Sequence, residues 1–352
     1  MDSKIKNIYN LISLNLIFFF LFIIIIELIF GYWFEKYNFG PYLREHRLKK
    51  IPYQMTLDNI KYNYDYIRNS NAFRGQEIDP KEIKIIMVGG STTDERYKPE
   101  EFSIVEILNK KLNKQNFNLK IINAGIEGQS TRGHIANFSY WFNKIENFNP
   151  EFIIFYIGIN DAYFLNSNHS DLQDGWIENP NKFESFLDNL KSRSIFANLI
   201  RKIKHKFYIK DETKRIIYDY DYHMKNNKEK KIYVNYEKKF DMYDLDLILK
   251  SNNIIVNKYL KNIDQLYSLT KSLGAKPIFI NQPAQQDFFS EILFALNHSL
   301  ILHCEKKGYN CINLVKKLKA TNDFWWDGMH TTPKGSRAIA DNIFPELINF
   351  LN

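Results

Sequence analysis

The ten residues KIIMVGGSTT, at positions 84–93, decide the fold. The segment 84–88 has the composition of a buried strand, and the two glycines after it allow the chain to turn tightly. Ser91 stands on that turn, where a serine beside a base can become a nucleophile. A serine in this place can also simply cap a helix. The stretch matches neither a P-loop, a Rossmann fingerprint nor a G-x-S-x-G elbow.

Downstream of this stretch, short apolar runs alternate with segments of helical periodicity. Further strands are expected at 119–122, 152–157, 277–280 and 311–314, and helices at 100–114, 133–146, 254–273, 288–307 and from Pro333 onward. Five strands separated by helices predict an α/β fold with a doubly wound, flavodoxin-like, five-stranded parallel sheet. Ligands bind at the carboxyl ends of the strands in such sheets.

Three more motifs fall where strands or connections end. The second strand runs into NAGIEGQS at 123–130, the third into GIND at 158–161, and DGMH at 327–330 precedes the last helix. A tetrahedral oxyanion needs hydrogen-bond donors, which the N–H of Gly128 and the amide of Asn160 could supply. Asp327 stands three residues before His330, so its carboxylate could hold the imidazole. Each motif alone is also an ordinary turn signal.

Taken together and in this order, the four blocks resemble the SGNH (GDSL-type) serine hydrolase and esterase family, in a membrane-anchored form. The resemblance covers about residues 80–350. It implies that Ser91 is the nucleophile, that Asp327 and His330 complete the triad, and that Ser91, Gly128 and Asn160 form the oxyanion hole. The first block departs from the family pattern, because Gly90 stands where G-D-S has Asp. Similar G-G-S-T forms occur among family members that act on carbohydrate esters.

The N-terminal segment 11–34 is almost wholly apolar and long enough to cross a bilayer as a helix. No small-residue cleavage pattern follows it, so we expect an uncleaved, single-pass signal anchor; the alternative is a buried core helix. Basic residues between 36 and 50 outnumber Lys4 and Lys6 and favour a cytoplasmic enzyme. Analogy with anchored relatives that meet envelope glycans favours the extracytoplasmic side, which we predict.

The expected organisation is an anchor at 1–36, a connector at 37–80 and a hydrolase domain at 81–352 with a basic insertion at 162–246. Between positions 201 and 240 there are 13 Lys and Arg residues against 6 Asp and Glu, which accounts for nearly all of the net charge of +8. This segment could form a lid, bind anionic ligands, or be a solvated surface. Six tyrosines within it could stack on sugars: Tyr208, Tyr218, Tyr220, Tyr222, Tyr233 and Tyr236. No nucleic-acid motif accompanies the charge, so a nucleic-acid partner is not expected.

The sequence predicts neither a metal site nor a cofactor, because no Cys and His residues have metal-ligand spacing. The two cysteines, Cys304 and Cys311, are seven residues apart. We expect them to be small buried hydrophobic residues, in preference to a disulfide bond.

The predicted function is hydrolysis of an acyl or acetyl ester, on a carbohydrate or a lipid, through an acyl-enzyme. O-acyl transfer to a glycan requires the same triad and stays open. A catalytically inactive, membrane-tethered binding module is a further alternative. The presence of all five site residues opposes it.

Overall fold

The computed structural model describes residues 3–35, 38–165, 172, 176, 181–206, 216–221, 245–285 and 291–352. The chain forms two compact units. The small unit comprises Met1–Arg44 and Asp174–Lys214, and the large unit comprises Glu45–Gln173 and Arg215–Asn352. Among the predicted sugar-stacking tyrosines, Tyr208, Tyr222, Tyr233 and Tyr236 lie outside the described residues.

A five-stranded parallel sheet forms the core of the large unit. Its strands are β3 (Ile85–Gly89), β4 (Ile121–Gly125), β5 (Phe152–Ile157), β7 (Lys276–Asn281) and β8 (Asn310–Ile312). They lie in the order β4-β3-β5-β7-β8, and every neighbouring pair is parallel. All residues of β3, β4 and β5 are buried, which explains their almost unbroken apolar sequences. The predicted doubly wound α/β fold is confirmed.

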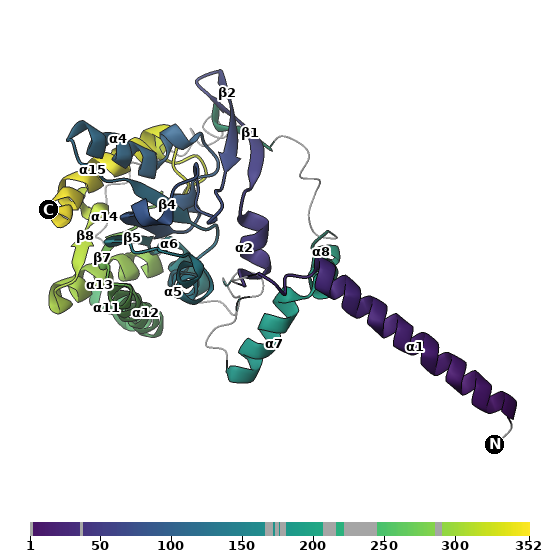
Figure 1. Cartoon of the computed structure of the whole chain (residues 1–352). Helices are drawn as coiled ribbons and strands as arrows, with labels where there is room; N and C mark the ends of the chain where they lie inside the picture. Colours follow the sequence, from purple (N-terminus) through teal and green to yellow (C-terminus); the bar gives the residue numbers. More distant parts are fainter. Residues whose placement is uncertain are drawn as a thin grey trace. The chain divides into compact units, whose positions relative to one another are not determined.

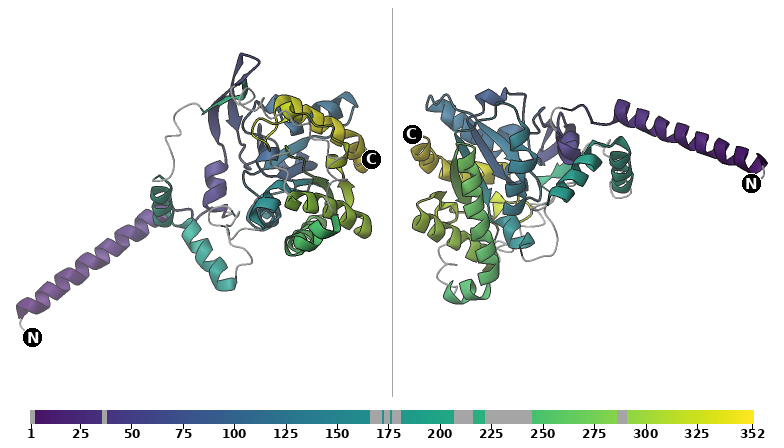
Figure 2. Two further views of the ribbon diagram at one scale, coloured as in Figure 1. Left: turned by 180° about the vertical axis from the view of Figure 1, so that it is seen from behind. Right: turned by 60° about the horizontal axis from the view of Figure 1, so that its bottom comes forward.

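Helices cover the sheet in two groups. The longer ones are α4 (Ile104–Lys114), α5 (Thr131–Tyr140), α12 (Asn253–Ser272), α13 (Glu291–Lys307) and α15 (Pro333–Leu351). Helix α15 packs against α4, whereas α12 packs against α5 and α13 (Figure 1). Figure 2 shows the same grouping from behind, with yellow α15 beside blue α4. The helix expected from residue 100 begins at Ile104, because the hydroxyl of Ser103 caps it by accepting from the N–H of Glu106.

Short helices complete the large unit. The α-helical ones are α3 (Ser91–Asp94), α6 (Ile159–Phe164), α11 (Leu245–Ser251) and α14 (Leu314–Lys317). Single 3₁₀ turns occur at Pro80–Glu82, Glu100–Phe102, Phe142–Lys144 and Asn322–Phe324. Both α3 and α6 directly follow a strand of the parallel sheet, β3 and β5 respectively.

A second, three-stranded sheet in the large unit was not predicted. Strands β1 (Lys50–Leu57) and β2 (Ile60–Ile67) form an antiparallel hairpin in the segment expected as a connector. Asp58 and Asn59 form its two-residue turn, with φ values of 52° and 60°. Strand β6 (Ile216–Asp219) comes from the segment expected as an insertion and pairs with β1 in parallel.

The small unit is helical. It contains α1 (Ser3–Phe30), α7 (Lys182–Arg193) and α8 (Ile195–Lys206), and α2 (Gly40–His46) begins at its end. Within α1, the 22 residues Tyr9–Phe30 are long and apolar enough to cross a membrane, with a mean hydropathy of 2.8 over an 18-residue window. Because 0% of that window is buried, the alternative of a buried core helix is wrong. This helix is either a signal sequence or an anchor.

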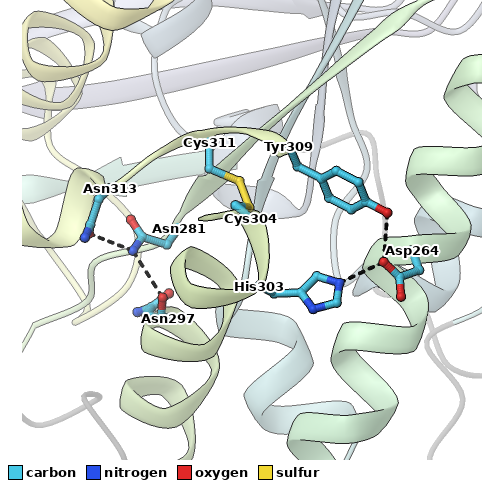
Figure 3. The surroundings of a disulfide bond; sticks show 8 residues. All are labelled: Asp264, Asn281, Asn297, His303, Cys304, Tyr309, Cys311 and Asn313. Carbon is cyan, nitrogen blue, oxygen red and sulfur yellow. Dashed lines mark hydrogen bonds and ion pairs between the residues drawn. A yellow bond between two sulfur atoms is a disulfide. The ribbon is translucent and has the colours of Figure 1, made fainter. Parts of the chain in front are cut away.

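The prediction of two unpaired cysteines is wrong, because Cys304 and Cys311 form a disulfide. Cys304 lies near the end of α13 and Cys311 in β8, with their Cα atoms 6.2 Å apart, which a disulfide can bridge (Figure 3). The short turn between the two elements brings the thiols together, which sequence spacing alone did not reveal. Nearby, Asp264 accepts hydrogen bonds from His303 at 2.7 Å and Tyr309 at 2.9 Å.

Removing this disulfide should lower the stability of the large unit. A cross-link that closes so short a loop contributes roughly 2–3 kcal/mol, equivalent to a shift in Tm of about 5–10 °C. Thermal unfolding of the double variant Cys304→Ser/Cys311→Ser would measure the shift. Adding a reductant to the unsubstituted chain should reproduce it, whereas the double variant should not respond. An unchanged Tm in both experiments would contradict the conclusion that a disulfide between Cys304 and Cys311 stabilises the large unit.

Candidate active site

The turn after β3 presents the hydroxyl group of Ser91. Strand β3 ends at Gly89, and Ser91 begins α3. Gly90 is required between them, because a Cβ at that position would lie 2.2 Å from the amide nitrogen of Asn160. The absence of a side chain at Gly90 thus allows the Asn160 amide to lie directly beside the turn.

A continuous chain of hydrogen bonds links Ser91, His330 and Asp327. The Nε2 atom of His330 lies 2.8 Å from Oγ of Ser91, and its Nδ1 lies 2.5 Å from Oδ2 of Asp327. An ionised carboxylate can only accept, so Nδ1 carries the proton and Nε2 accepts the hydroxyl hydrogen of Ser91. The structure therefore brings together three residues that are up to 239 positions apart.

Asp327 is held in its ionised form. Burial would raise the pKa of its carboxyl, but the hydrogen bond from His330 and the electrostatic attraction between the two side chains lower that pKa below its ordinary value. The backbone N–H groups of His330 and Met329 also donate to Oδ1, at 2.8 and 3.2 Å. These bonds fix the orientation of the carboxylate and, through it, that of the imidazole.

Gly128 and Asn160 come from the two strands that flank β3. Gly128 follows β4 and has a φ of 76°, a conformation that favours glycine. Asn160 lies in the first turn of α6, after β5, and its Nδ2 donates to the carbonyl of Gln129 at 2.8 Å. An amide nitrogen has two hydrogens, and this bond uses only one of them. Gly128 and Asn160 thus follow the ends of the two strands that lie on either side of β3.

Residues 85–343 match the protein family described as GDSL-like Lipase/Acylhydrolase. The chain belongs to this family. It is therefore an enzyme of the esterase and acylhydrolase class, and the family resemblance found in the sequence is confirmed. A search of curated proteins found no match to this acylhydrolase.

Solved structures similar to this acylhydrolase include TesA and two esterases. TesA is 11% identical, with a TM-score of 0.44 over 75% of this chain and 97% of its own. The esterase EstA from Pseudoalteromonas sp. is 12% identical, with a TM-score of 0.44 over 76% of this chain and 98% of its own. A catalytic mutant of Axe2, an acetylxylan esterase from Geobacillus stearothermophilus, is 13% identical, with a TM-score of 0.42 over 75% and 94%.

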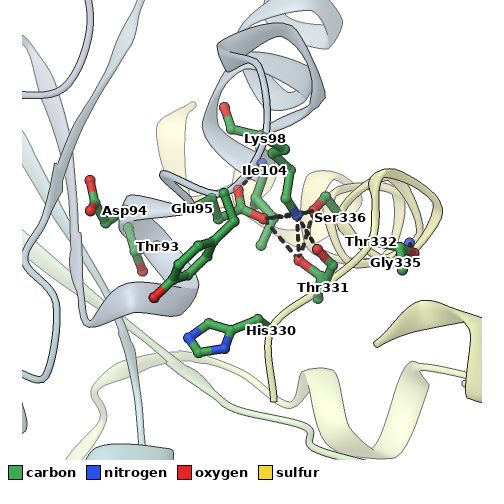
Figure 4. Close-up of polar contacts among 12 residues, drawn as sticks. Thr93, Asp94, Glu95, Lys98, Ile104, His330, Thr331, Thr332, Gly335 and Ser336 are labelled. Carbon is green, nitrogen blue, oxygen red and sulfur yellow. Dashed lines mark hydrogen bonds and ion pairs between the residues drawn. The ribbon is translucent and has the colours of Figure 1, made fainter. Parts of the chain in front are cut away.

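A buried ion pair of the acylhydrolase connects the Ser91 turn to the His330 loop (Figure 4). Glu95 directly follows α3 as its C-cap, and its carboxylate lies 2.8 Å from Nζ of Lys98. The same ammonium group donates to the hydroxyl of Thr331 at 2.9 Å and also to its carbonyl. Ser336, in α15, donates to Glu95 at 2.6 Å. Thr331 directly follows His330, so this network fixes the histidine loop relative to the serine turn.

The ion pair is almost inaccessible to water. The side chains of Lys98 and Glu95 are 1% and 2% exposed. Burial lowers the pKa of Lys98, and the carboxylate of Glu95 opposes that shift. Glu95 also has a φ of 48°, which is unfavourable for a residue with a side chain. Four groups that bond its carboxylate hold it there: Lys98, Ile104 N–H, Thr331 and Ser336.

Two arginines from the segment before β3 support the same turn. Arg68 is buried and donates to Asp94 at 2.9 Å and to the carbonyl of Gly125 at 2.6 Å. Arg74 donates to the carbonyls of Asp94 and Lys98. The hairpin region therefore contributes to the site, although it precedes the segment that matches the family.

Aromatic rings surround the imidazole of His330. The ring of Tyr97 makes an edge contact at 4.8 Å between centroids, and Trp326 stacks at 5.7 Å. Tyr218 of β6 contacts both Tyr97 and Trp326. Burial, together with the carboxylate of Glu127, raises the pKa of Tyr97, so its hydroxyl stays protonated. Among the described residues, no group of three or more His, Cys, Asp or Glu side chains could hold a metal ion.

Sequence reasoning missed Glu95, Lys98, Arg68 and Arg74. Glu95 and Lys98 occur in the stretch E-R-Y-K, four to seven residues after the nucleophile, which was the available signal. The arginines gave no signal, because their partners at the turn, Asp94, Lys98 and Gly125, are 20 to 57 positions away.

Lys98→Met should destabilise the large unit by roughly 3–5 kcal/mol, because it leaves the carboxylate of Glu95 buried without its cation. Urea unfolding would measure this loss. Lys84→Met is the matched control, since Lys84 pairs with Glu151 at 3.0 Å but both side chains are about half exposed. The control should change the free energy of unfolding by less than about 1 kcal/mol. Equal losses in the free energy of unfolding for Lys98→Met and Lys84→Met would contradict the conclusion that burial makes the Lys98–Glu95 pair important for stability.

Proposed function

We propose that this acylhydrolase cleaves an acyl ester with Ser91 as nucleophile, His330 as general base and Asp327 as the residue that orients the imidazole. The observation that carries the proposal is the unbroken hydrogen-bond chain from Ser91 Oγ through His330 to Asp327. Oγ attacks the ester carbonyl while Nε2 of His330 takes its proton. The alcohol then leaves with that proton, and the acyl group stays on Ser91. Water, deprotonated by His330, releases the acid.

The oxyanion of the tetrahedral intermediate would be stabilised by three donors. These are the backbone N–H groups of Ser91 and Gly128 and the side-chain amide of Asn160. Their positions at the ends of β3, β4 and β5 support this assignment, because parallel strands bring these ends to one edge of the sheet. Donors set in place by the fold need no reorganisation during the reaction.

The alcohol part of the substrate is proposed to be a carbohydrate. The flat rings of Tyr97 and Trp326 lie against His330. His330 must give its proton to the leaving alcohol, so the alcohol has to come close to these rings. Such rings combine an apolar face with a polar edge, which suits sugars better than extended acyl chains. Acetylated oligosaccharides should therefore give a higher kcat/KM than long-chain p-nitrophenyl esters. A preference for the long-chain esters would favour a lipid substrate.

O-acyl transfer to a glycan uses the same acyl-enzyme and differs only in the second acceptor. Measuring how the acyl group partitions between water and an added sugar would separate the two reactions. The intact triad opposes the third possibility, an inactive binding module, and labelling of Ser91 by a phosphonate would test it.

We propose further that α1 is retained as an anchor and that the large unit is extracytoplasmic. The disulfide between Cys304 and Cys311 supports this side, because structural disulfides persist in oxidising compartments. The basic residues after α1 oppose it, but long domains can be translocated despite such charges.

Ser91→Ala should reduce ester turnover by several orders of magnitude. Only the oxyanion hole and substrate binding would still accelerate the reaction, by roughly 10³- to 10⁴-fold over the rate in water. His330→Ala should have a similar effect. Ser268→Ala is the matched control: Ser268 is exposed on α12 and should leave the rate unchanged. Near-normal turnover of Ser91→Ala would refute the assignment.

Asn160→Ala should lower kcat by about 10²- to 10³-fold with little change in KM, since its amide would bind the transition state more tightly than the substrate. Asn257→Ala, at an exposed position of α12, is the control. A change in KM alone would instead make Asn160 a substrate-positioning residue.

Protease added to spheroplasts of an expressing bacterial host should digest the large unit. Digestion that requires lysis would place the large unit in the cytoplasm and contradict the proposed side. An immunoblot against the C-terminus would follow the cleavage, with a cytoplasmic protein as the control for intact cells.

A further inference from the structure

Helix α8 of the small unit exposes apolar side chains where a helix of a water-soluble unit would normally bury them. Leu199, Ile200 and Ile203 are 51%, 57% and 49% exposed, although they lie on one side of the helix. We call these three residues the α8 patch. In α7, which contacts α8, Phe183 and Phe186 are likewise exposed.

Asn198, which directly precedes the α8 patch, is the residue of α8 that faces the protein. Asn198 is buried, and its amide donates to the carbonyls of Ser192 and Ser194 at 3.0 and 2.8 Å. A helix that packs on a core in water would be expected to bury Leu199, Ile200 and Ile203 in preference to Asn198. An apolar partner on the outer side would account for their exposure.

The small unit fixes the start of α8 to the end of the apolar α1. Glu27, three residues before the end of α1, accepts from the hydroxyl of Ser194 at 2.5 Å and from the N–H of Ile195 at 3.0 Å. The N–H of Tyr32 donates to the carbonyl of Arg193 at 2.8 Å. The carboxylate of Glu27 would be costly in an apolar helix without a partner. The hydrogen-bond donors and the helix dipole at the N-terminus of α8 stabilise it. If α1 crosses a bilayer, α8 begins where α1 leaves it.

The charge of α8 complements an anionic surface. Its sequence IFANLIRKIKHK contains four basic residues, Arg201, Lys202, Lys204 and Lys206, and no acidic one. A helix with one apolar side and a basic polar side is typical of those that lie in the headgroup region of a membrane. Each basic residue near an anionic bilayer surface contributes about 1 kcal/mol.

We propose that the α8 patch inserts into the headgroup region of the same bilayer that α1 spans, with anionic lipid as its partner. The inference rests on the proposed retention of α1 as an anchor, and it is independent of the chemistry assigned to Ser91. With α8 at the surface, the small unit is attached to the membrane by two helices of different kinds.

Nitroxide labels on the full-length chain would test this placement. Leu199→Cys and Ile203→Cys variants are labelled and reconstituted into phosphatidylcholine vesicles that contain phosphatidylglycerol. Ile254→Cys is the matched control, because Ile254 is an equally apolar and 72% exposed residue of α12 in the large unit. The unsubstituted chain, whose cysteines are in a disulfide, gives the background labelling.

The labels on α8 should be relaxed several-fold more strongly by oxygen, which concentrates in lipid, than by a water-soluble nickel chelate, and the label at Ile254 should show the reverse. Labels on α8 that respond like the label at Ile254 would overturn the proposal. Low access to both reagents with spin–spin broadening would also overturn it and indicate a second copy of the chain. Alkaline washing of the vesicles tests the anchor separately, because it would release a chain that α1 does not hold.

Discussion

A single buried ammonium group, Nζ of Lys98, joins the turn that carries Ser91 to the loop that carries His330. It bonds Glu95 on one side and Thr331 on the other, and neither charge of the pair reaches water. Such a pair is favourable only when every remaining polar contact is made. The distance between nucleophile and base therefore depends on a network that tolerates little displacement.

Local patterns in the sequence were sufficient to predict the parallel sheet and the three residues, Ser91, His330 and Asp327, that hydrogen bonds bring together. The apolar strands fix where the chain turns, and a doubly wound sheet brings the ends of β3, β4 and β5 to one edge. The hairpin β1-β2 was missed although its turn residues, Asp58 and Asn59, are typical of a two-residue turn. Arg68 and the pairing of β6 with β1 depend on contacts between distant segments, which no local pattern encodes.

The surroundings of His330 come from three separate parts of the chain. Tyr97 follows the nucleophile turn, Trp326 precedes the histidine, and Tyr218 belongs to β6. Ser91, Asp327 and His330 all lie within the segment that matches the family. One ring of this aromatic group, that of Tyr218, comes from strand β6. In the sequence, β6 lies in the segment expected as an insertion at 162–246.

The small unit is built from two stretches of chain, Met1–Arg44 and Asp174–Lys214. Cutting the backbone once, after α1, would leave α7 and α8 attached to the enzyme and still able to hold α1 through the carboxylate of Glu27. If α1 is retained as an anchor, a single cleavage after it would therefore leave these contacts between α1 and the rest of the chain in place. A recombinant form shortened only at its N-terminus would keep the exposed apolar side chains of α7 and α8, and it would be prone to self-association in detergent-free buffer.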